Sequence, residues 1–252
     1  MTNTFVTVEV MSPRTRPIVS RRERPAKPAL TREGIVTAAV GVMQAEGLDK
    51  VTMRRLAQEL DTGAASLYVY LRNTAELHAA MLEQLLSQVD LSPVTAAGDW
   101  HDRLIEILTS YTSILFRQPG LAQSVLVTRP SGPAYLNLAE AILALLSAGG
   151  VPPARAAWAV DLLLHFATST AAEQGTRHRA ADADDEQDAL AEALREAPAD
   201  TFPQIAALSA ELMSGAGPDR LNWGFRVLIN GITQTPRPQE PEQRGKPQPP
   251  GA

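Results

Sequence analysis

Apolar residues recur along most of the chain every three or four positions, which is the period of one buried face of an α-helix. The first such run consists of Ile35, Ala38, Ala39, Val42 and Met43. Thr31 stands before the run as an N-cap residue, and Gly47 follows it at a position where helices commonly end. The pattern predicts a first helix between Thr31 and Gly47.

A short helix is predicted to begin at Thr52. Val51 and Leu56 flank this residue at the spacing of a hydrophobic staple, in which the apolar residue before the cap packs on one in the first turn. The polar residues 61–63 then predict a tight turn, and residues 64–71 a third short helix. Two short helices joined by a turn therefore follow the first helix.

The rest of the chain shows longer helical runs between clear breaks. Asn73 and Glu76 have capping-box spacing and predict the start of a longer helix, which Ser92-Pro93 ends. Gly and Pro residues separate further helices predicted near 99–117, 120–127, 133–148, 153–176, within 185–213, and 219–232. No alternating strand pattern competes with them, so the predicted fold class is all-α.

Composition supports this fold class and narrows the chemistry. The chain is 44% hydrophobic but only 5% aromatic, which suits a helical core. It contains no Cys, so disulfides and thiolate metal sites are excluded. It has neither a run of about 20 apolar residues nor the apolar stretch of a signal peptide, so we expect a cytoplasmic protein with no membrane partner.

Charge is distributed unevenly along a chain whose formal net charge is −5. Residues 1–28 contain four Pro and a cluster of Arg and Lys, which predicts a flexible basic arm. The alternative is a solvated tail without a role. Residues 233–252 are rich in Pro and predict a disordered tail.

The two short helices between residues 52 and 72 have the layout of a helix-turn-helix. In that motif the first helix braces a second, whose outward side chains enter the major groove of DNA. Leu67 and Leu71 are four positions apart and face the core, which leaves the other side of the second helix exposed. By periodicity alone, an ordinary helical hairpin fits equally well.

A resemblance favours the helix-turn-helix. Thr52-Met-Arg-Arg-Leu-Ala-Gln-Glu-Leu60, followed by Leu67-Tyr68-Val-Tyr70-Leu-Arg-Asn73, resembles the signature of the tetracycline-repressor (TetR) family, and the resemblance extends over about 31–232. It implies a DNA-binding domain of three helices at 29–75 and a helical ligand-binding and dimerisation domain at 76–232. The DNA contacts it implies are Thr52, Arg54, Ala64, Ala65, Ser66, Tyr68, Val69, Tyr70 and Arg72.

Arg54 is the strongest candidate among these contacts, because guanidinium pairing with guanine gives the best single base readout. Two positions depart from the family: Asp61 replaces the usual turn glycine, and Thr74 replaces a common lysine. Asp tolerates the left-handed conformation, so we expect the turn to form. Arg72 or the basic arm is then expected to replace the phosphate contact of the lysine.

In the second half, the resemblance implies that helices near 153–176 and 219–232 pair with their symmetry mates in a homodimer. Their apolar stripes comprise Val160, Leu163, Leu164 and Ala167, and Leu221, Phe225, Leu228 and Ile232. The alternative is that these stripes belong to the core of a single chain. The sequence therefore predicts which two helices form the dimer but leaves open which of their faces do so.

The resemblance also implies a pocket for a small-molecule inducer. The candidate ligand contacts are Tyr111, Phe116, Thr128, Arg129, Tyr135, Asn137, Trp158, His165, Phe166 and Glu173. Any single aromatic residue among them is more often a core residue than a ligand contact. Val125 and Asp90 stand near the positions where the tetracycline repressor has histidines for its magnesium-bound drug, so we expect no metal and a more apolar ligand. Thr128-Arg129-Pro130 is the segment expected to move on binding.

Catalysis has no support in the sequence. The four His residues lack metal spacing, and no phosphate-binding loop or nucleophile elbow occurs, so we expect no catalytic residues, no metal and no cofactor. The prediction is a repressor that binds double-stranded operator DNA as a homodimer and is released by a small molecule. The alternatives are an activator of the same family, or a helical ligand-binding or interaction protein without DNA binding.

Overall fold

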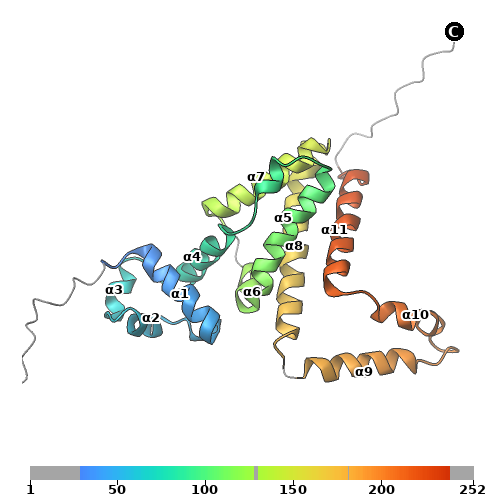
Figure 1. The fold of residues 1–252 in the computed structure, drawn as a ribbon, viewed down its shortest axis with the longest axis horizontal. Coiled ribbons are helices and arrows are strands. Elements are labelled where there is room, and N and C mark those ends of the chain that lie inside the picture. The colour runs from blue at the N-terminus through green and yellow to red at the C-terminus, as the bar shows by residue number, and fades with distance from the viewer. Residues whose placement is uncertain (1–28, 128–129, 181, 239–252) are drawn as a thin grey trace, which may run out of the picture. The chain divides into compact units, whose positions relative to one another are not determined.

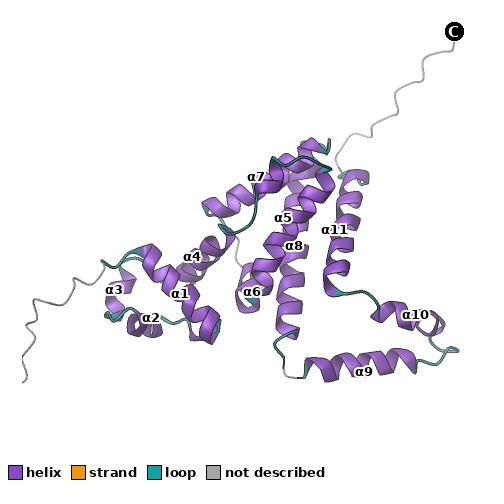
Figure 2. Cartoon of the chain, viewed as in Figure 1, coloured by secondary structure: helices purple, strands orange, loops and turns teal. Residues whose placement is uncertain are grey.

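A computed structural model describes residues 29–127, 130–180 and 182–238 of the chain. Within these ranges every regular element is a helix, in agreement with the predicted fold class (Figures 1 and 2). The α-helices are α1 (Arg32–Glu46), α2 (Met53–Glu59), α3 (Ala64–Tyr68), α4 (Thr74–Leu86), α5 (Trp100–Phe116), α6 (Pro119–Val127), α7 (Pro133–Ala148), α8 (Pro153–Arg177), α9 (Ala183–Arg195), α10 (Pro203–Met213) and α11 (Gly217–Gln234). Two 3₁₀ turns, η2 (Leu48–Lys50) and η3 (Ser92–Val94), connect them.

Three of the predicted helices have clearly different bounds in the structure. Helix α4 ends at Leu86, well before Ser92-Pro93. The region 185–213 contains two helices, α9 and α10, because Pro203 begins a new helix after a loop. The third short helix ends at Tyr68 instead of residue 71. Beyond it the chain continues as a tighter turn, in which the amides of both Tyr70 and Leu71 donate to the carbonyl of Leu67 at 3.0 Å.

The caps of the first helices form as the sequence predicts. The hydroxyl of Thr31 accepts a hydrogen bond from the amide of Gly34 at 3.0 Å, and the hydroxyl of Thr52 accepts one from the amide of Arg55 at 3.1 Å. Val51 and Leu56 are both buried, which agrees with the predicted hydrophobic staple. Cap and staple together set where α2 starts.

Helix α4 crosses the boundary that we expected between residues 75 and 76. The Asn73 side chain caps it by accepting from the amide of Glu76 at 2.8 Å. Glu76 does not complete a capping box with Asn73, because its carboxylate accepts from the amide of Arg72 instead, at 3.0 Å. Since α4 packs on α1 as well as on α6 and α7, the two expected domains share this helix.

The core of the second half forms where α8 packs on α5, α6 and α7. Leu104, Ile107 and Leu108 of α5 are completely buried in it. Gly175 of α8 permits a close approach at one end, since a Cβ atom there would lie 2.7 Å from the carbonyl oxygen of Phe116. The chain needs glycine at this position for packing and not for its backbone angles.

The expected basic arm, 1–28, and residues 239–252 of the expected tail lie outside the described residues. In the described part of the chain, no helix is both long enough and apolar enough to span a lipid bilayer.

Replacing Gly175 by Ala should destabilise the fold. The added methyl group must push α8 away from the backbone of Phe116, at a cost of about 1–3 kcal/mol in the free energy of unfolding. Gly41→Ala is the matched control, because Gly41 lies in α1 with no atom within 4 Å of its Cβ position. This control should be neutral or stabilise by up to about 1 kcal/mol. Chemical denaturation measures both; equal stability of the two variants would contradict the packing argument.

Candidate nucleic-acid interface and ligand site

Helix α3 turns one face toward the core and the opposite face outward. Leu67 and Leu71 are completely buried, as the sequence predicts, and α3 packs on α2. Tyr68, Val69 and Tyr70 are exposed by 52%, 81% and 37%. Ala65 and Ser66 are exposed as well, and Ala64 is half-buried. The predicted DNA contacts within and just after α3 are therefore accessible to solvent, Ala64 only partly.

The two consecutive arginines of α2 lie in different surroundings. Arg55 forms ion pairs with Glu46 of α1 at 2.6 Å and with Glu59 at 2.9 Å, and its hydrogen bond lowers the pKa of the Glu46 carboxyl. Arg54 is exposed and borders an open hollow of about 560 Å³ together with Ala64 of α3. Arg55 thus joins α2 to α1, while Arg54 is accessible beside α3.

The turn between α2 and α3 adopts the expected conformation. Asp61 has a φ of 46°, in the left-handed region, and no other non-glycine residue in the described ranges has a positive φ. The amide of Thr62 donates to the carbonyl of Ala57 at 2.8 Å, which closes the turn. Asp61 therefore takes the place of the family's usual glycine, as expected.

The start of α4 contributes one further cation to this surface. Arg72 pairs with Glu76 at 3.2 Å, and the backbone hydrogen bond from Arg72 lowers the pKa of the Glu76 carboxyl. The Arg72 side chain nevertheless remains 88% exposed. Thr74, at the position where the family has lysine, is exposed too.

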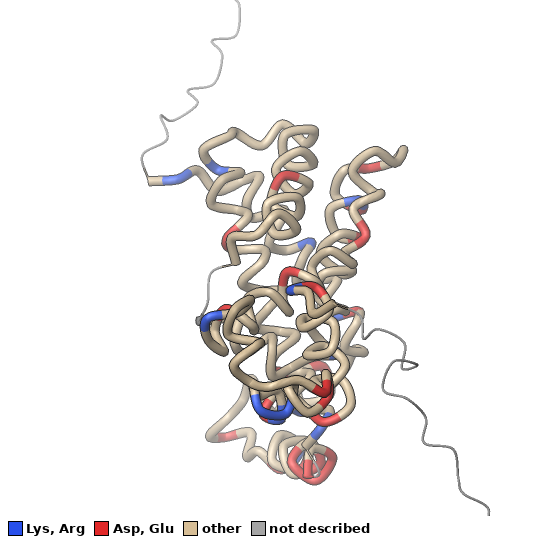
Figure 3. The backbone as a smooth tube through the Cα atoms, turned by 90° about the vertical axis from the view of Figure 1, so that its left-hand side faces the viewer, with Lys and Arg blue, Asp and Glu red and all other residues tan. Residues whose placement is uncertain are grey.

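Residues 31–75 form a nearly neutral unit, since they contain five basic and five acidic residues. Figure 3 shows Lys and Arg scattered among Asp and Glu rather than gathered into one continuous basic stretch. Attraction to the phosphates is therefore weak for these helices by themselves.

Among the candidate ligand contacts, Tyr111 has the clearest polar environment. It is buried in α5, and its hydroxyl forms a hydrogen bond of 2.7 Å with the hydroxyl of Thr168 in α8. Burial raises the pKa of Tyr111 to about 12, with Tyr135 contributing to the shift. Thr168 in turn donates to the carbonyl of Leu164. The structure thus brings Tyr111, Tyr135 and Thr168 into one neighbourhood.

Sequence reasoning missed Thr168, although a signal for it existed. It lies on the buried stripe of α8 that also contains Leu164, Ala167 and Ala171. A buried hydroxyl among alanines and leucines needs a hydrogen-bond partner. That partner can be a carbonyl of the preceding turn of the same helix or a polar group on a neighbouring helix.

The other described candidates on α8 do not converge with Tyr111. Trp158 is 59% exposed, and His165 and Glu173 are exposed as well. Glu173 pairs with Arg177 at 2.9 Å, and Arg237 stacks over the Trp158 ring at 4.8 Å. Phe166 packs edge-to-face on Phe225 of α11, with 5.4 Å between ring centroids.

The remaining candidates lie elsewhere in the second half. Phe116, at the end of α5, is 37% exposed, and its ring lies 5.9 Å from that of His178. On α7, Tyr135 is half-buried and Asn137 is exposed. Thr128 and Arg129 lie outside the described residues, so their expected contacts and their expected movement remain predictions.

The apolar stripes named for α8 and α11 lie mainly inside the single chain, which favours the alternative that they belong to its core. Val160, Leu163, Leu164 and Ala167 are buried within the chain, and so are Phe225 and Ile232; Leu221 and Leu228 are half-buried. The exposed apolar side chains on the same two helices are Trp158, Leu162, Trp223 and Val227. The predicted stripes belong to the core because α8 and α11 also pack on each other and on α5.

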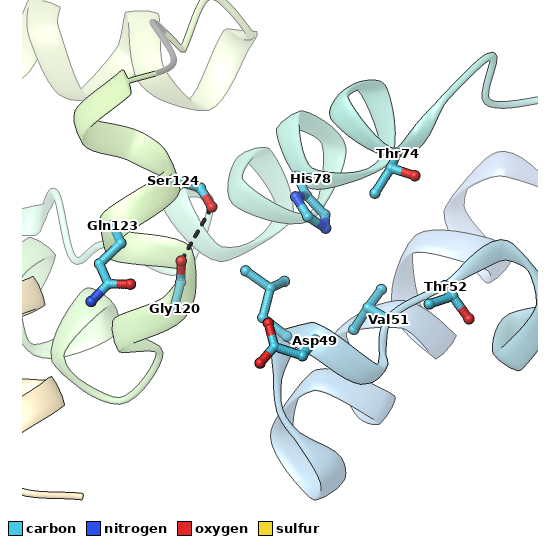
Figure 4. Close-up of a pocket in the computed structure, with 9 residues that line it drawn as sticks. Asp49, Val51, Thr52, Thr74, His78, Gly120, Gln123 and Ser124 are labelled. Atoms are coloured by element: carbon cyan, nitrogen blue, oxygen red, sulfur yellow. Dashed lines mark hydrogen bonds between the residues drawn. The ribbon is translucent and has the colours of Figure 1, made fainter. Parts of the chain in front are cut away.

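A pocket of about 560 Å³ lies between η2, α4 and α6 (Figure 4). His78 of α4 borders it, with Asp49 of η2 and Gln123 and Ser124 of α6. Nε2 of His78 is buried and has no hydrogen-bond partner in the described part of the chain, and burial lowers the pKa of this histidine. Val125 borders an adjoining smaller cavity with His78 and Leu82. No group of three potential metal-ligating side chains occurs in the described ranges.

Comparison with known proteins identifies the class. Residues 35–81 match the family model for bacterial regulatory proteins of the tetR family, and residues 92–235 match the tetracyclin repressor-like C-terminal domain. The chain therefore belongs to the TetR family of bacterial regulatory proteins, which confirms the resemblance seen in the sequence. An HTH-type transcriptional regulator of Saccharopolyspora erythraea is 32% identical over 211 residues, 83% of this chain and 87% of that protein.

Two solved structures from Streptomyces coelicolor are similar over most of the chain. One, described as the transcription regulator SCO7704, has 55% sequence identity, covers 85% of this chain and 100% of its own, and gives a TM-score of 0.67. The other is the TetR family protein ActR in complex with actinorhodin, with 34% identity, coverage of 81% and 96%, and a TM-score of 0.75.

The half-buried His78 should make the protein less stable in mild acid. Its folded pKa lies below the unfolded value of 6.5, so as the pH falls through 6.5 the unfolded chain takes up a proton that the folded chain does not. Stability is then lost. In His78→Gln the melting temperature should fall less between pH 7.5 and 5.5 than in the wild type. Ser124→Ala, which changes the same pocket without a titrating group, should keep the wild-type slope, and identical slopes for all three proteins would contradict this assignment.

Proposed function

We propose that this chain is a dimeric transcriptional repressor that binds operator DNA through α2 and α3 in the cytoplasm and leaves it when a small, largely apolar molecule binds in the second half. The observation that carries the proposal is the exposure of Arg54 beside the outward face of α3, in a chain of the TetR family. These side chains can reach base edges while Leu67 and Leu71 anchor the helix.

Arg54 is proposed as the main polar reader of the operator. Its guanidinium is exposed, whereas that of Arg55 is held by two carboxylates. A guanidinium that approaches a guanine can bond to both O6 and N7, which no other base pair edge offers in the same arrangement. Tyr68, Tyr70 and Arg72 surround the α3 surface and are suited to phosphate contacts.

The dimer is proposed to form through the exposed side chains of α8 and α11. Trp158 and Leu162 are four residues apart on α8, and Trp223 and Val227 are four apart on α11. Each pair therefore forms an apolar patch on one side of its helix. Two copies that pair these patches remove large aromatic surfaces from water and place two α3 helices on one DNA duplex.

The ligand is proposed to contact the neighbourhood of Tyr111, Tyr135 and Thr168, between α5, α7 and α8. Buried hydroxyl groups among apolar side chains can orient a mostly apolar molecule. ActR, a similar protein, has been solved with actinorhodin bound. Val125, an aliphatic residue, cannot ligate magnesium, so a magnesium–tetracycline chelate is not the proposed ligand. Tight, magnesium-dependent tetracycline binding in a titration would refute this part.

Replacing Arg54 by Ala should weaken operator binding by about 1–3 kcal/mol per half-site and relax the preference at one base pair, with an unchanged melting temperature. Fluorescence anisotropy with DNA from upstream of the gene measures this loss. Arg177→Ala is the matched control, because it removes the same charge from the exposed end of α8. Absence of sequence-specific binding by the wild type, or equal loss in both variants, would overturn the proposed role.

Replacing Leu162 by Glu should give a folded monomer with little operator affinity. This side chain is 45% exposed in the single chain, so the charge harms the proposed dimer face and not the core. Leu136→Glu on α7, where the side chain is 58% exposed, is the matched control and should remain dimeric. Light scattering reports the mass of each variant. A wild-type monomer, or a dimeric Leu162→Glu, would rule out this interface.

A further inference from the structure

The end of α11 is fixed against the first turn of α8. The Arg155 side chain of α8 donates to the carbonyl oxygens of Ile232 at 3.2 Å and Thr233 at 2.7 Å, both in the last turn of α11. The last carbonyls of a helix have no partners within it, and a guanidinium at this end can satisfy them. The chain therefore leaves α11 at a defined place beside α8.

The first residues after α11 place a second guanidinium on α8. Arg237 is half-buried, and its Cζ lies 4.8 Å from the centre of the Trp158 ring, within the range of a cation–π interaction. Pro236 and Pro238 flank Arg237. A proline fixes its own backbone and restricts the residue before it, so this short segment loses little conformational freedom when the contact forms.

Arg237 leaves much of Trp158 uncovered. The tryptophan is still 59% exposed, and Leu162, one helical turn further along α8, is 45% exposed. These two side chains form the α8 patch of the proposed dimer face. A second copy that packs on Leu162 therefore also covers the exposed part of Trp158, next to Arg237. Tryptophan and arginine are also the residue types most enriched among the side chains that dominate binding at interfaces.

Removal of water strengthens the contact between a guanidinium and an aromatic ring. The interaction is weak when both groups are exposed and at least twice as strong when they are desolvated. A contact that is stronger in the dimer than in the single chain adds the difference to the affinity of the dimer. The stack of Arg237 on Trp158 is then a contact whose strength depends on a second copy.

We infer that residues 235–238 belong to the dimer interface and that each copy encloses its Trp158 between its own Arg237 and the other copy. The inference rests on the proposed dimer and deepens it by adding one cation to a contact that is otherwise apolar. Dimer affinity then depends on a side chain that lies beyond the last helix.

Replacing Arg237 by Ala should weaken the dimer about fivefold per site, or about 25-fold for its two identical sites. Fluorescence-detected sedimentation of the full chain over a dilution series measures the dissociation constant. Arg237→Lys keeps the charge but not the planar guanidinium, so its effect should be smaller than that of Arg237→Ala. Arg117→Ala is the matched control, because it removes the same charge from the exposed end of α5.

Two further backgrounds separate a role in the interface from a role in the single chain. In Trp158→Phe the loss caused by Arg237→Ala should shrink, because a phenyl ring binds a cation less strongly than an indole. In Leu162→Glu, the expected folded monomer, Arg237→Ala should change the melting temperature little, since no second copy covers the stack.

The outcomes separate the inference from the proposed dimer. A wild-type dimer whose dissociation constant is unchanged or lowered by Arg237→Ala would overturn the inference alone. An equal loss in Arg117→Ala, or an undiminished loss in the Trp158→Phe background, would do the same. A wild-type chain that stays monomeric at every concentration would overturn the proposed dimer and the inference with it.

Discussion

The burial of Leu67 and Leu71 is the constraint on which the outward face of α3, the proposed DNA-binding surface, depends. Helix α3 has only five residues, so its own hydrogen bonds cannot hold it in a fixed direction. Leu67 within α3 and Leu71 just after it are both completely buried, and α3 packs on α2, so these two leucines determine which residues point outward. Val69 is exposed because it lies two positions from each of these buried leucines, on the opposite side of the helical turn.

Electrostatic contacts complete the orientation that these leucines begin. Arg55 of α2 forms one ion pair with Glu46 at the end of α1 and a second with Glu59 of its own helix. Exposed ion pairs of this kind contribute little to stability individually, but they restrict where the arginine can lie. Because both carboxylates bind Arg55, the exposed guanidinium of the neighbouring Arg54 remains available to bind an anionic or polar group.

The sequence predicted the helices well because caps, staples and breaks are local signals. Thr31, Thr52 and Asn73 cap their helices as expected, and the left-handed Asp61 could be anticipated from its turn. The faces of α8 and α11 were not predictable in the same way. Both helices carry apolar residues on more than one side, so periodicity could not tell the intramolecular stripe from the exposed one.

Some contacts and one helix boundary were also not predicted from the sequence. Thr168 pairs with Tyr111 across 57 positions of sequence, and the split of region 185–213 depended on one proline. The Glu76 carboxylate accepts from the amide of Arg72 and not from that of Asn73, the cap residue. These two amides are adjacent in the chain, so the spacing alone could not tell which one would be the donor.

The equal numbers of basic and acidic residues in 31–75 affect how such a protein would search a genome. Non-specific binding to DNA grows with the number of phosphates a surface neutralises, and a neutral surface neutralises few. Helices of this kind would spend little time on unrelated DNA. Their residence at a site would be decided by a handful of base edges, so a single base change could move a gene into or out of control.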